Sequence, residues 1–576
     1  MRQGIRGLLI PVLTGFLSLS ALAQTNSPDA GALLQELQRQ LPKQQTLPNP
    51  AAPKEPVKPR EAKPSEAKIT IQGFKVDGNQ SLGDLVIQET LRPWISKVVP
   101  FEELQKAADA LAALYKVNNR LAQVSVPPQR ITDGVVTLKV LEAKLGAVHV
   151  DMPNGPSRFG EDRARRYITD ANRLSEIVNT QAVERSIYVL NETPGIAVTS
   201  QLESGKSDGD VDIRLSLSDT KPYRGRLEVN NNGSRTTGIL QRVAAVFFDG
   251  IGGIGDQLGL SNIKSEGSDY SLASYSLPLN SDGLRAGFSA SYLDYDNVGK
   301  FALPMNPNGG FGYAKTIGFN LTYPLLRSPS ENRNLTFALD RKNYANKSQS
   351  TGNFNSEYRI NNLVLGYSAN RYDSFAGGGV TQGGLTMTKG HLEFGANNGN
   401  TYGAFTPTTF TKYNLNISRN QQIVPDQTIL NINFTAQIAS VDLDSAERFY
   451  LGGPYGVRGY PGSQGGGAQG AMLNLELQQA LEDKVIASVF YDIGMVQQYK
   501  NKATYEQVKG ATGAENTYTL SSLGVGLKRA DKDIVWSTSI AWKLGHNPLL
   551  DNTGRGVNND GRSKSAYIWA QLQWMF

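Results

Sequence analysis

The chain has no cysteine among its 576 residues. Stray thiols are a liability in an oxidising compartment, so their absence fits a protein of the periplasm or the outer membrane. The same absence excludes disulfide scaffolds, zinc sites built on thiolates and cysteine nucleophiles. The composition therefore favours an exported protein.

Histidine is scarce as well, because His149, His391 and His546 are the only three and each stands alone in its segment. None belongs to a cluster with metal-ligand spacing, so we expect no metal site. Gly250–Gly255 matches the G-x-G-x-x-G pattern, but a dinucleotide site needs a helix next, and another strand-like segment follows. We interpret it as a hairpin turn, and we expect neither a cofactor nor enzymatic activity.

The chain also lacks a strong excess of charge of either sign, because it has 58 Lys and Arg and 52 Asp and Glu, a net charge of +6. Nucleic-acid-binding proteins gather basic residues in a patch or a block. No such block occurs here. We therefore expect no nucleic-acid partner.

Long apolar segments are missing beyond the amino terminus, although a membrane helix needs about 20 consecutive apolar residues. The amino terminus has Arg2 and Arg6, a short apolar segment Leu8–Leu22 and the small-x-small site Ala21–Ala23. These features predict a secretory signal peptide at residues 1–23 rather than an anchor. Any later passage through a membrane requires a β-barrel.

Asp29–Leu41 is the first segment with helical periodicity, and we assign residues 24–41 to one amino-terminal helical region. So short a helix is marginal alone in water, so we expect it to dock elsewhere in the protein; a frayed terminal helix is the alternative. Residues 42–67 hold seven prolines, which predict an extended linker. The apolar stripe of the helix consists of Leu33, Leu34, Leu37 and Leu41.

Residues 68–145 and 146–220 repeat one β-α-α-β-β pattern, an internal repeat of about 75 residues. Arg163, Arg165 and Arg166 of the second module are expected on a solvated helix face, with a binding patch as the alternative. In the first module we expect strand 69–76, helices 83–92 and 101–115, and strands 121–127 and 134–142. In the second we expect strand 145–150, helices 161–171 and 180–191, and strands 195–203 and 210–218.

Residues 221–576 lose helical periodicity. Alternating runs such as Arg242–Phe248 and Thr316–Leu325 are separated by clusters of Gly, Asn, Asp and Ser. This pattern predicts a transmembrane β-barrel, and at about 22 residues per strand and connection roughly 16 strands fit. A soluble β-sandwich is the alternative, but one sandwich has only about 100 residues.

One glycine-rich loop, Arg448–Gly470, lies between two strand-like segments of this region. Each glycine disfavours a regular element, so we expect neither strand nor helix within the loop. It contains Val457, Arg458, Gly459 and Tyr460. Further on, Asp492 is a lone carboxylate in a strand-like run. Guanidinium–carboxylate pairs are geometrically specific, so we predict a tucked-in loop locked by Arg458 and Asp492.

Together these segments resemble the TpsB transporters of two-partner secretion, within the outer-membrane insertase superfamily. Arg448–Pro454 with Val457–Tyr460 is similar to the loop-six motif of that family, and Phe490–Gly494 to its partner strand. Pro127–Gly134 and Leu190–Ile196 resemble parts of two POTRA modules.

The resemblance implies α+β POTRA modules followed by an all-β transmembrane barrel of about 16 strands in the outer membrane. Family members capture an unfolded TpsA-type exoprotein in the periplasm and export it without ATP. That cargo is an adhesin, a haemolysin or a contact-dependent growth-inhibition toxin. The helix Asp29–Leu41 corresponds to the family's plug, and its Gln-rich face suits a wet lumen, into which Arg458 points.

The same resemblance implies further surroundings, namely outer-membrane lipid, lipopolysaccharide and the barrel-assembly machinery, which reads the terminal Phe576. An outer-membrane insertase is the main alternative, but it typically carries more POTRA modules and no plug helix. A diffusion porin lacks POTRA modules, and a siderophore receptor needs a plug larger than residues 24–67. For Arg458, the alternative is a purely stabilising role in the barrel.

Overall fold

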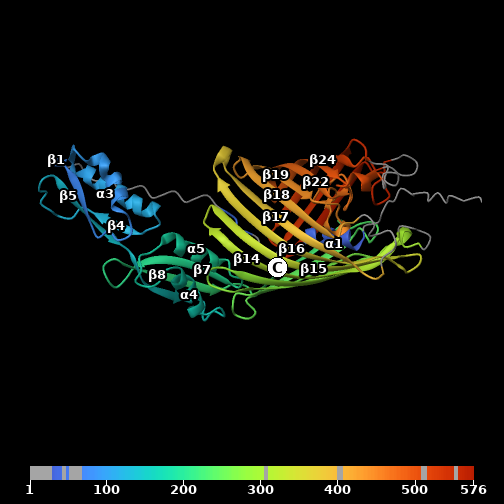
Figure 1. Ribbon diagram of the computed structural model, residues 1–576, viewed down its shortest axis with the longest axis horizontal. Helices are drawn as coiled ribbons and strands as arrows, with labels where there is room; N and C mark the ends of the chain where they lie inside the picture. The colour runs from blue at the N-terminus through green and yellow to red at the C-terminus, as the bar shows by residue number, and fades with distance from the viewer. Residues whose placement is uncertain are drawn as a thin grey trace, which may run out of the picture.

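The computed structural model describes residues 29–41, 47–50, 68–303, 309–397, 406–506, 515–549 and 556–576. Two small α/β modules lie in a row at one end of a long barrel (Figure 1). The predicted signal peptide and most of the predicted linker lie outside the described residues. No described helix is long and apolar enough to span a membrane.

The first module has a three-stranded sheet in the order β2-β5-β4, and its helices pack Leu104, Leu111 and Tyr115 into a closed core. The predicted strand 69–76 is divided in two, because the amide of Gln72 donates to the carbonyl of Gly134. Its first half pairs with β3, a strand that the sequence did not reveal. The elements are β1 Lys68–Ile71, β2 Gly73–Asp77, α2 Asp84–Leu91, β3 Lys97–Pro100, α3 Phe101–Val117, β4 Ala122–Ser125 and β5 Val135–Glu142.

The second module repeats the arrangement with a sheet in the order β6-β8-β7. Its two helices begin and end where the sequence predicted. The solvated position expected for Arg163 is wrong, because its guanidinium donates to the carbonyls of Phe159 and Gly253 and so ties the module to the barrel. The elements are β6 Lys144–Asp151, α4 Glu161–Ala171, α5 Thr180–Asn191, β7 Ile196–Ser204 and β8 Asp210–Asp219.

The rest of the described sequence forms a closed antiparallel barrel of 16 strands, which confirms the predicted fold class. The barrel closes between its first and last strands, where Asn230 pairs with Gln571 and Arg226 with Met575. The strands are β9 Tyr223–Asn230, β10 Gln241–Asp249, β11 Gln257–Lys264, β12 Ser268–Pro278, β13 Arg285–Asp296, β14 Gly310–Arg327, β15 Glu331–Ser348, β16 Phe354–Asp373, β17 Gly379–Phe394, β18 Thr409–Val424, β19 Thr428–Ala439, β22 Gln469–Ala480, β23 Val485–Gln497, β24 Thr517–Asp531, β25 Ile534–Leu544 and β26 Ala566–Met575.

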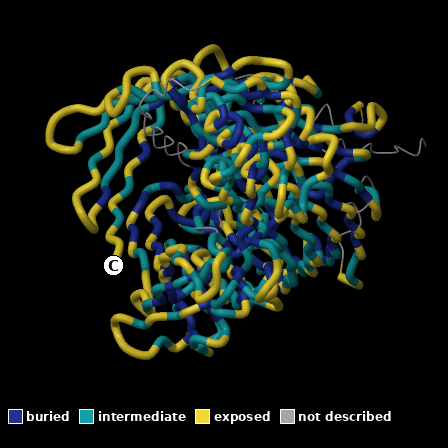
Figure 2. Tube along the Cα trace, turned by 90° about the vertical axis from the view of Figure 1, so that its left-hand side faces the viewer, coloured by how far each residue is buried: buried dark blue, intermediate teal, exposed yellow. Residues whose placement is uncertain are grey.

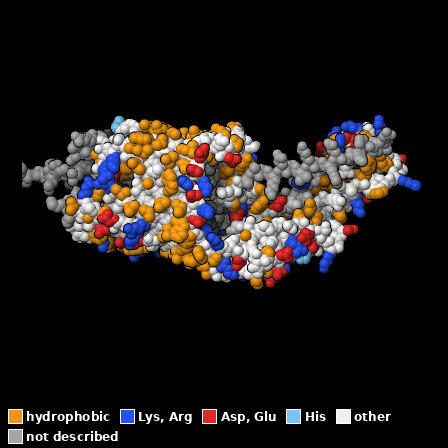
Figure 3. Space-filling view, turned by 180° about the vertical axis from the view of Figure 1, so that it is seen from behind, with side chains coloured by type: hydrophobic (Ala, Val, Ile, Leu, Met, Phe, Trp, Pro, Cys, Tyr) orange, Lys and Arg blue, Asp and Glu red, His pale blue; other side chains and the backbone are white. Residues whose placement is uncertain are grey.

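The two faces of the barrel wall differ because successive side chains of a strand point to opposite sides. On β15 the exposed outward residues include Leu335 and Leu339, whereas Asn332 and Asn334, on the other face, are buried. Apolar side chains accordingly cover much of the outside of the barrel (Figure 3). Figure 2 shows the buried segments gathered toward the middle of the molecule and exposed ones at its edge.

Gly250–Gly255 forms the turn between β10 and β11, as the sequence indicated. The turn lies against the second module. A Cβ on Gly255 would come within 2.2 Å of the Thr193 side chain, and the backbone there has a φ of +78°. Glycine is therefore required both by the conformation and by the close contact between module and barrel.

Candidate functional site

The amino-terminal helix α1 (Ala30–Gln40) lies inside the barrel (Figure 1). Its cap is Asp29, whose carboxylate accepts from the amide of Ala32 at 3.0 Å. The predicted apolar stripe packs on the lumen wall, where Leu33, Leu34 and Leu37 are fully buried and Leu41 is half-buried. The wall supplies aromatic partners to this cluster, including Tyr270, Tyr295, Tyr344 and Tyr358.

The polar face of α1 is only partly wet, in contrast to the expectation from its glutamines. Much of it rests on loop six, the segment between β19 and β22. The amide of Gln35 donates to the carbonyl of Ala446. The hydroxyls of Ser445 and Ser463 donate to Asp29 at 2.6 Å and to Glu36 at 2.8 Å. The plug helix therefore binds the loop as well as the wall.

The closeness of α1 to loop six is visible at two residues of the helix. A Cβ on Gly31 would lie 2.7 Å from the Cβ of Ala446 and 2.8 Å from its amide nitrogen, so only glycine fits there. Burial raises the pKa of Glu36 to about 7, against the opposing effects of its hydrogen bond from Ser463 and the charge of Arg39. The docked helix therefore favours a protonated Glu36.

Loop six folds inward and contains more regular structure than its glycines predicted. A short 3₁₀ turn, η4, spans Ser445–Glu447, and β20 (Phe449–Tyr450) pairs with β21 (Gly466–Gly467). The expectation of no strand in Arg448–Gly470 was therefore wrong at these four positions, and also at Gln469 and Gly470, where β22 begins. The pairing is possible because Gly466 presents no side chain where the ring of Tyr450 lies, 2.5 Å from a Cβ built there.

Arg458 and Asp492 meet as the sequence predicted. The Arg458 guanidinium donates from Nε to Asp492 Oδ2 at 3.0 Å and from Nη2 to Oδ1 at 2.9 Å, a bidentate pair. The third contact, from Nη1 to Glu476 at 2.6 Å, was not predicted. The guanidinium also lies 3.3 Å from the centroid of the Phe490 ring.

The surroundings of this pair satisfy both partners. Asp492 is fully buried and accepts further hydrogen bonds from Asn474 at 2.8 Å and Ser522 at 3.2 Å. The indole of Trp569 donates to the carbonyl of Arg458 at 2.8 Å. The tip of loop six is thus held by side chains of β22, β23, β24 and β26. We call this set the arginine anchor.

The other residues of the motif pack the tip. Val457 and Tyr460 are fully buried. A Cβ on Gly459 would lie 2.7 Å from the Cβ of Ser522, so a side chain there would push the loop off the wall. The Tyr460 hydroxyl has no hydrogen-bond partner among the described residues, and Lys543 Nζ lies 4.8 Å from the centroid of its ring.

A second anchor, which the sequence did not reveal, holds the start of the loop. Glu447 is 2% exposed and accepts from Lys342 and Asn362 at 2.9 Å each and from Lys412 at 2.7 Å. Its carbonyl accepts from Gln437 at 3.0 Å. Burial alone would raise the pKa of Glu447, but the two lysines lower it to about 2. We call this set the glutamate anchor.

The comparisons with known proteins agree with this architecture. A family model described as haemolysin secretion/activation protein ShlB/FhaC/HecB matches residues 209–528, and one for a POTRA domain of ShlB type matches residues 69–143. The chain belongs to the ShlB/FhaC/HecB family. Members of the ShlB/FhaC/HecB family are outer-membrane transporters with POTRA modules in the periplasm, and this confirms the resemblance found in the sequence.

Relatives within this family are distant in sequence but match along most of the protein. The chain is 26% identical over 539 residues to the heme/hemopexin transporter protein HuxB of Haemophilus influenzae, covering 90% of this chain and 92% of HuxB. It is 22% identical over 420 residues to the outer membrane transporter CdiB of Escherichia coli, covering 72% and 69%. The solved structure of CdiB from Escherichia coli matches with a TM-score of 0.69 at 18% identity, covering 94% and 95%. This structural likeness shows the shared fold.

Proposed function

We propose that this protein exports one large, unfolded exoprotein of the TpsA type from the periplasm to the cell surface through its barrel. The observation that carries the proposal is a barrel joined to two POTRA modules and filled by two separable elements. The plug helix and loop six are held in the lumen by non-covalent contacts and contribute no strand to the wall, so both can move without unfolding it. The transport needs no ATP, because folding of the cargo outside the cell gives it direction.

The POTRA modules are proposed to capture the cargo by strand addition. Each three-stranded sheet has free edges among the described residues; β4 and β7 each pair on one side only. An extended peptide can add to such an edge through backbone hydrogen bonds, which tolerate many sequences. This mode suits a cargo that must remain unfolded until it leaves the cell.

Within the lumen, Arg458 and Asp492 are proposed to hold loop six in the position that export requires. The bidentate geometry and the additional contact with Glu476 support this role. Val457, Gly459 and Tyr460 are proposed to fit the tip against the wall. The helix Ala30–Gln40, as the plug, is proposed to leave the lumen when cargo enters.

An insertase function is less well supported, because the described residues hold two POTRA modules and a helix docked in the lumen. We further propose that the protein has no catalytic activity of its own. Its remaining partners would be outer-membrane lipid, lipopolysaccharide and the assembly machinery that reads the terminal Phe576. The cargo is proposed to be an adhesin, a haemolysin or a contact-dependent growth-inhibition toxin.

The first test is co-expression with the large exoprotein encoded beside this gene, in a Gram-negative host that lacks both. The unmodified protein should release the exoprotein at the surface. A variant that lacks Ile69–Leu217 should not, although heat-modifiable migration in gels should show a folded barrel. Equal export by the two proteins would contradict capture by the modules. No export by either would contradict the transport function, and assembly of other barrels would then be measured.

A further inference from the structure

The lumen wall contacts the backbone of the amino-terminal segment at three described places, and asparagine makes two of these contacts; at the third, Arg226 of β9 donates to the carbonyl of Gln40 at 2.9 Å. On β15 and β16 the lumen-facing positions include Asn332, Asn346 and Asn370, which are 2%, 5% and 3% exposed. We call these three residues the asparagine track. The opposite face of the same strands carries exposed apolar side chains, such as Leu335, Leu339 and Leu363, so the track is confined to the inside.

The first contact is with the linker. The carbonyl oxygen of Pro48 accepts from the side-chain amide of Asn370 at 2.7 Å and from that of Asn332 at 3.2 Å. The two asparagines also bond to each other at 3.1 Å, which fixes their orientation. Proline has no backbone N–H, so its carbonyl is the only backbone group it can offer. The pair therefore recognises the backbone rather than a side chain.

The second contact is at the start of the plug helix. The amide of Ala30 donates to the side-chain oxygen of Asn346 at 2.9 Å. The nitrogen of the same side chain donates to Ser356 at 2.8 Å, so its orientation is also fixed. One asparagine thus accepts from a backbone amide and two others donate to a backbone carbonyl. The track offers both kinds of partner that an extended polypeptide needs.

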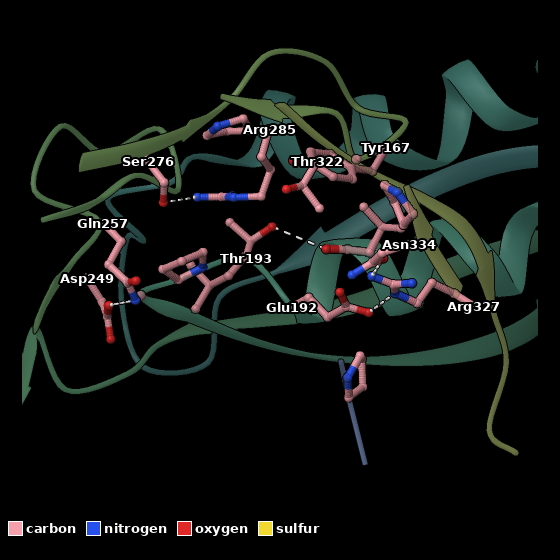
Figure 4. Close-up of a pocket in the computed structure, with 18 of the residues that line it drawn as sticks. Tyr167, Glu192, Thr193, Asp249, Gln257, Ser276, Arg285, Thr322, Arg327 and Asn334 are labelled. Carbon is pink, nitrogen blue, oxygen red and sulfur yellow. Dashed lines mark hydrogen bonds and ion pairs between the residues drawn. The ribbon is translucent and has the colours of Figure 1, made fainter. Parts of the chain in front are cut away.

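The position of the Pro48 contact puts it at the entrance of the barrel. Pro48 lines a cavity of about 360 Å³ between the second POTRA module and the ends of the strands. Figure 4 shows its polar lining, in which the guanidinium of Arg327 donates to the carboxylate of Glu192 and also, at 2.8 Å, to the side-chain oxygen of Asn334. Asn334 is two residues from Asn332 and faces the same side. A polypeptide that leaves the module and passes this cavity reaches the track first.

We propose that the asparagine track is a binding site for the backbone of an extended polypeptide in transit, and that the amino-terminal segment of this protein occupies the site at rest. The inference rests on the proposed transport function and deepens it. Neutral amides suit the task because each bond is weak and independent of sequence, so a moving polypeptide is guided but not retained. Cargo would displace Pro48 and Ala30 from the same side chains that it then uses.

The absence of cysteine allows a direct test by thiol cross-linking. Ser368→Cys places one thiol on the lumen face of β16 two residues from Asn370, and Asn49→Cys places another beside Pro48. A control, Ser539→Cys, places a lumen-facing thiol on β25 instead. The cargo is the exoprotein encoded beside this gene, fused to a cysteine-free domain that folds in the periplasm and stalls export, with single cysteines at several positions.

At rest, the thiol of Ser368→Cys should cross-link to that of Asn49→Cys. With stalled cargo this cross-link should disappear and the thiol should react with cargo at several positions, at least fivefold more than the Ser539→Cys control. Stalled cargo that reacts equally at both positions, or that leaves the linker cross-link intact, would overturn the inference while leaving transport established. Failure of the unmodified protein to export the unfused cargo would overturn the transport function and the inference together.

Replacement of the side chains gives an independent measurement. The double variant Asn332→Ala/Asn370→Ala should export cargo about tenfold more slowly, as expected for two lost hydrogen bonds to a polypeptide in transit. The matched control is Asn320→Ala on β14, whose only described side-chain bond is to Thr322 on its own strand. Its export should remain unchanged. Unchanged export by the double variant, with a folded barrel in gels, would overturn the inference.

Discussion

The two anchors of loop six are opposite in charge and hold different parts of the barrel. In the arginine anchor one cation, Arg458, lies between two carboxylates on β22 and β23. In the glutamate anchor one carboxylate, Glu447, lies between two lysines on β15 and β18. The loop thus spans the lumen and ties the early strands of the barrel to the late ones.

The difference between the anchors also explains where the plug lies. Glu447 of the glutamate anchor is the last residue of η4, and α1 docks on η4 through Gln35, Asp29 and the close approach at Gly31. Among the described residues, the hydrogen bonds and ion pairs of Arg458 go to the barrel wall and not to α1. The plug also accepts a hydrogen bond from Ser463 of the same loop at Glu36. We infer that the glutamate anchor holds the start of the loop and the docking surface around η4, whereas the arginine anchor holds the tip of the loop.

The largest effect is expected for Glu447→Ala. The change leaves Lys342 and Lys412 buried without their carboxylate, and the loss of one partner of such a group costs about 3–5 kcal/mol. Loop six should detach at its start and release the plug, so purified protein in planar bilayers should show a large rise in open-channel time. Export should also fail. A closed resting channel in Glu447→Ala would contradict control of the plug by this anchor.

A slightly smaller effect is expected for Arg458→Ala, at about 3 kcal/mol, because lumen water reaches part of this site. The barrel should still assemble, export should fall more than tenfold, and the resting channel should change little. Arg458→Lys keeps the charge but loses the planar fork, so its export should fall between that of Arg458→Ala and that of the unmodified protein. Full export by Arg458→Ala would make the residue a dispensable structural contact. Combining it with Glu447→Ala should give additive losses of stability if the anchors are independent.

The contact at Gly31 tests the plug without replacing a residue of either anchor. Gly31→Leu should clash with Ala446 and destabilise the docked helix by about 2 kcal/mol, typical of overpacking. Open-channel time should rise roughly thirtyfold, the equivalent of that free energy. The exposed Gln38 provides the control, since Gln38→Leu on the same helix should leave the channel closed. Equal behaviour of the two variants would show that η4 is not the docking surface.

The smallest effect is a pH dependence of docking. The pKa of Glu36 is about 7 in the docked helix and 4.5 in an exposed one. A raised pKa means that docking is most favourable below pH 4.5 and weakens as the pH rises through 7. Between pH 5.5 and 7.5 the docked state should lose about 1–2 kcal/mol. Channel opening should rise over this interval in the unmodified protein, and Glu36→Gln should abolish the change. The charged group nearest to Glu36 is Arg39, which does not titrate there.

Sequence alone predicted the anchor that carries a motif and missed the one that does not. Arg458 stands out because it sits in a glycine-rich loop with a lone carboxylate further on. Glu447 has no such signal, since Lys342 and Lys412 are single lysines on strands far apart in the sequence. Only the curvature of the folded barrel wall and the inward fold of loop six bring them together.

Other parts of the site lay within reach of the sequence. Glu476 is an isolated charge on a predicted strand, the same signal that identified Asp492. The outward residues of the last strand occupy even-numbered positions, whereas Trp569 occupies an odd one. Because side chains alternate between the two faces of a strand, this places Trp569 in the lumen. The fold itself was predictable, because the alternating segments indicate a barrel of about 16 strands and the repeated pattern indicates two α/β modules. The docking of α1 on loop six was not, because amphipathicity predicts burial of a face but not its partner.

The most direct test of the account is to tie the plug to loop six. Glu36→Cys and Ser463→Cys introduce the only two thiols of the protein at side chains that are hydrogen-bonded in the resting state, and a short, reducible thiol cross-linker joins them. Export of the exoprotein should stop when the cross-link forms and return when it is reduced, while each single variant exports normally with or without the reagent. Undiminished export with the cross-link complete would contradict a plug that must leave loop six for transport.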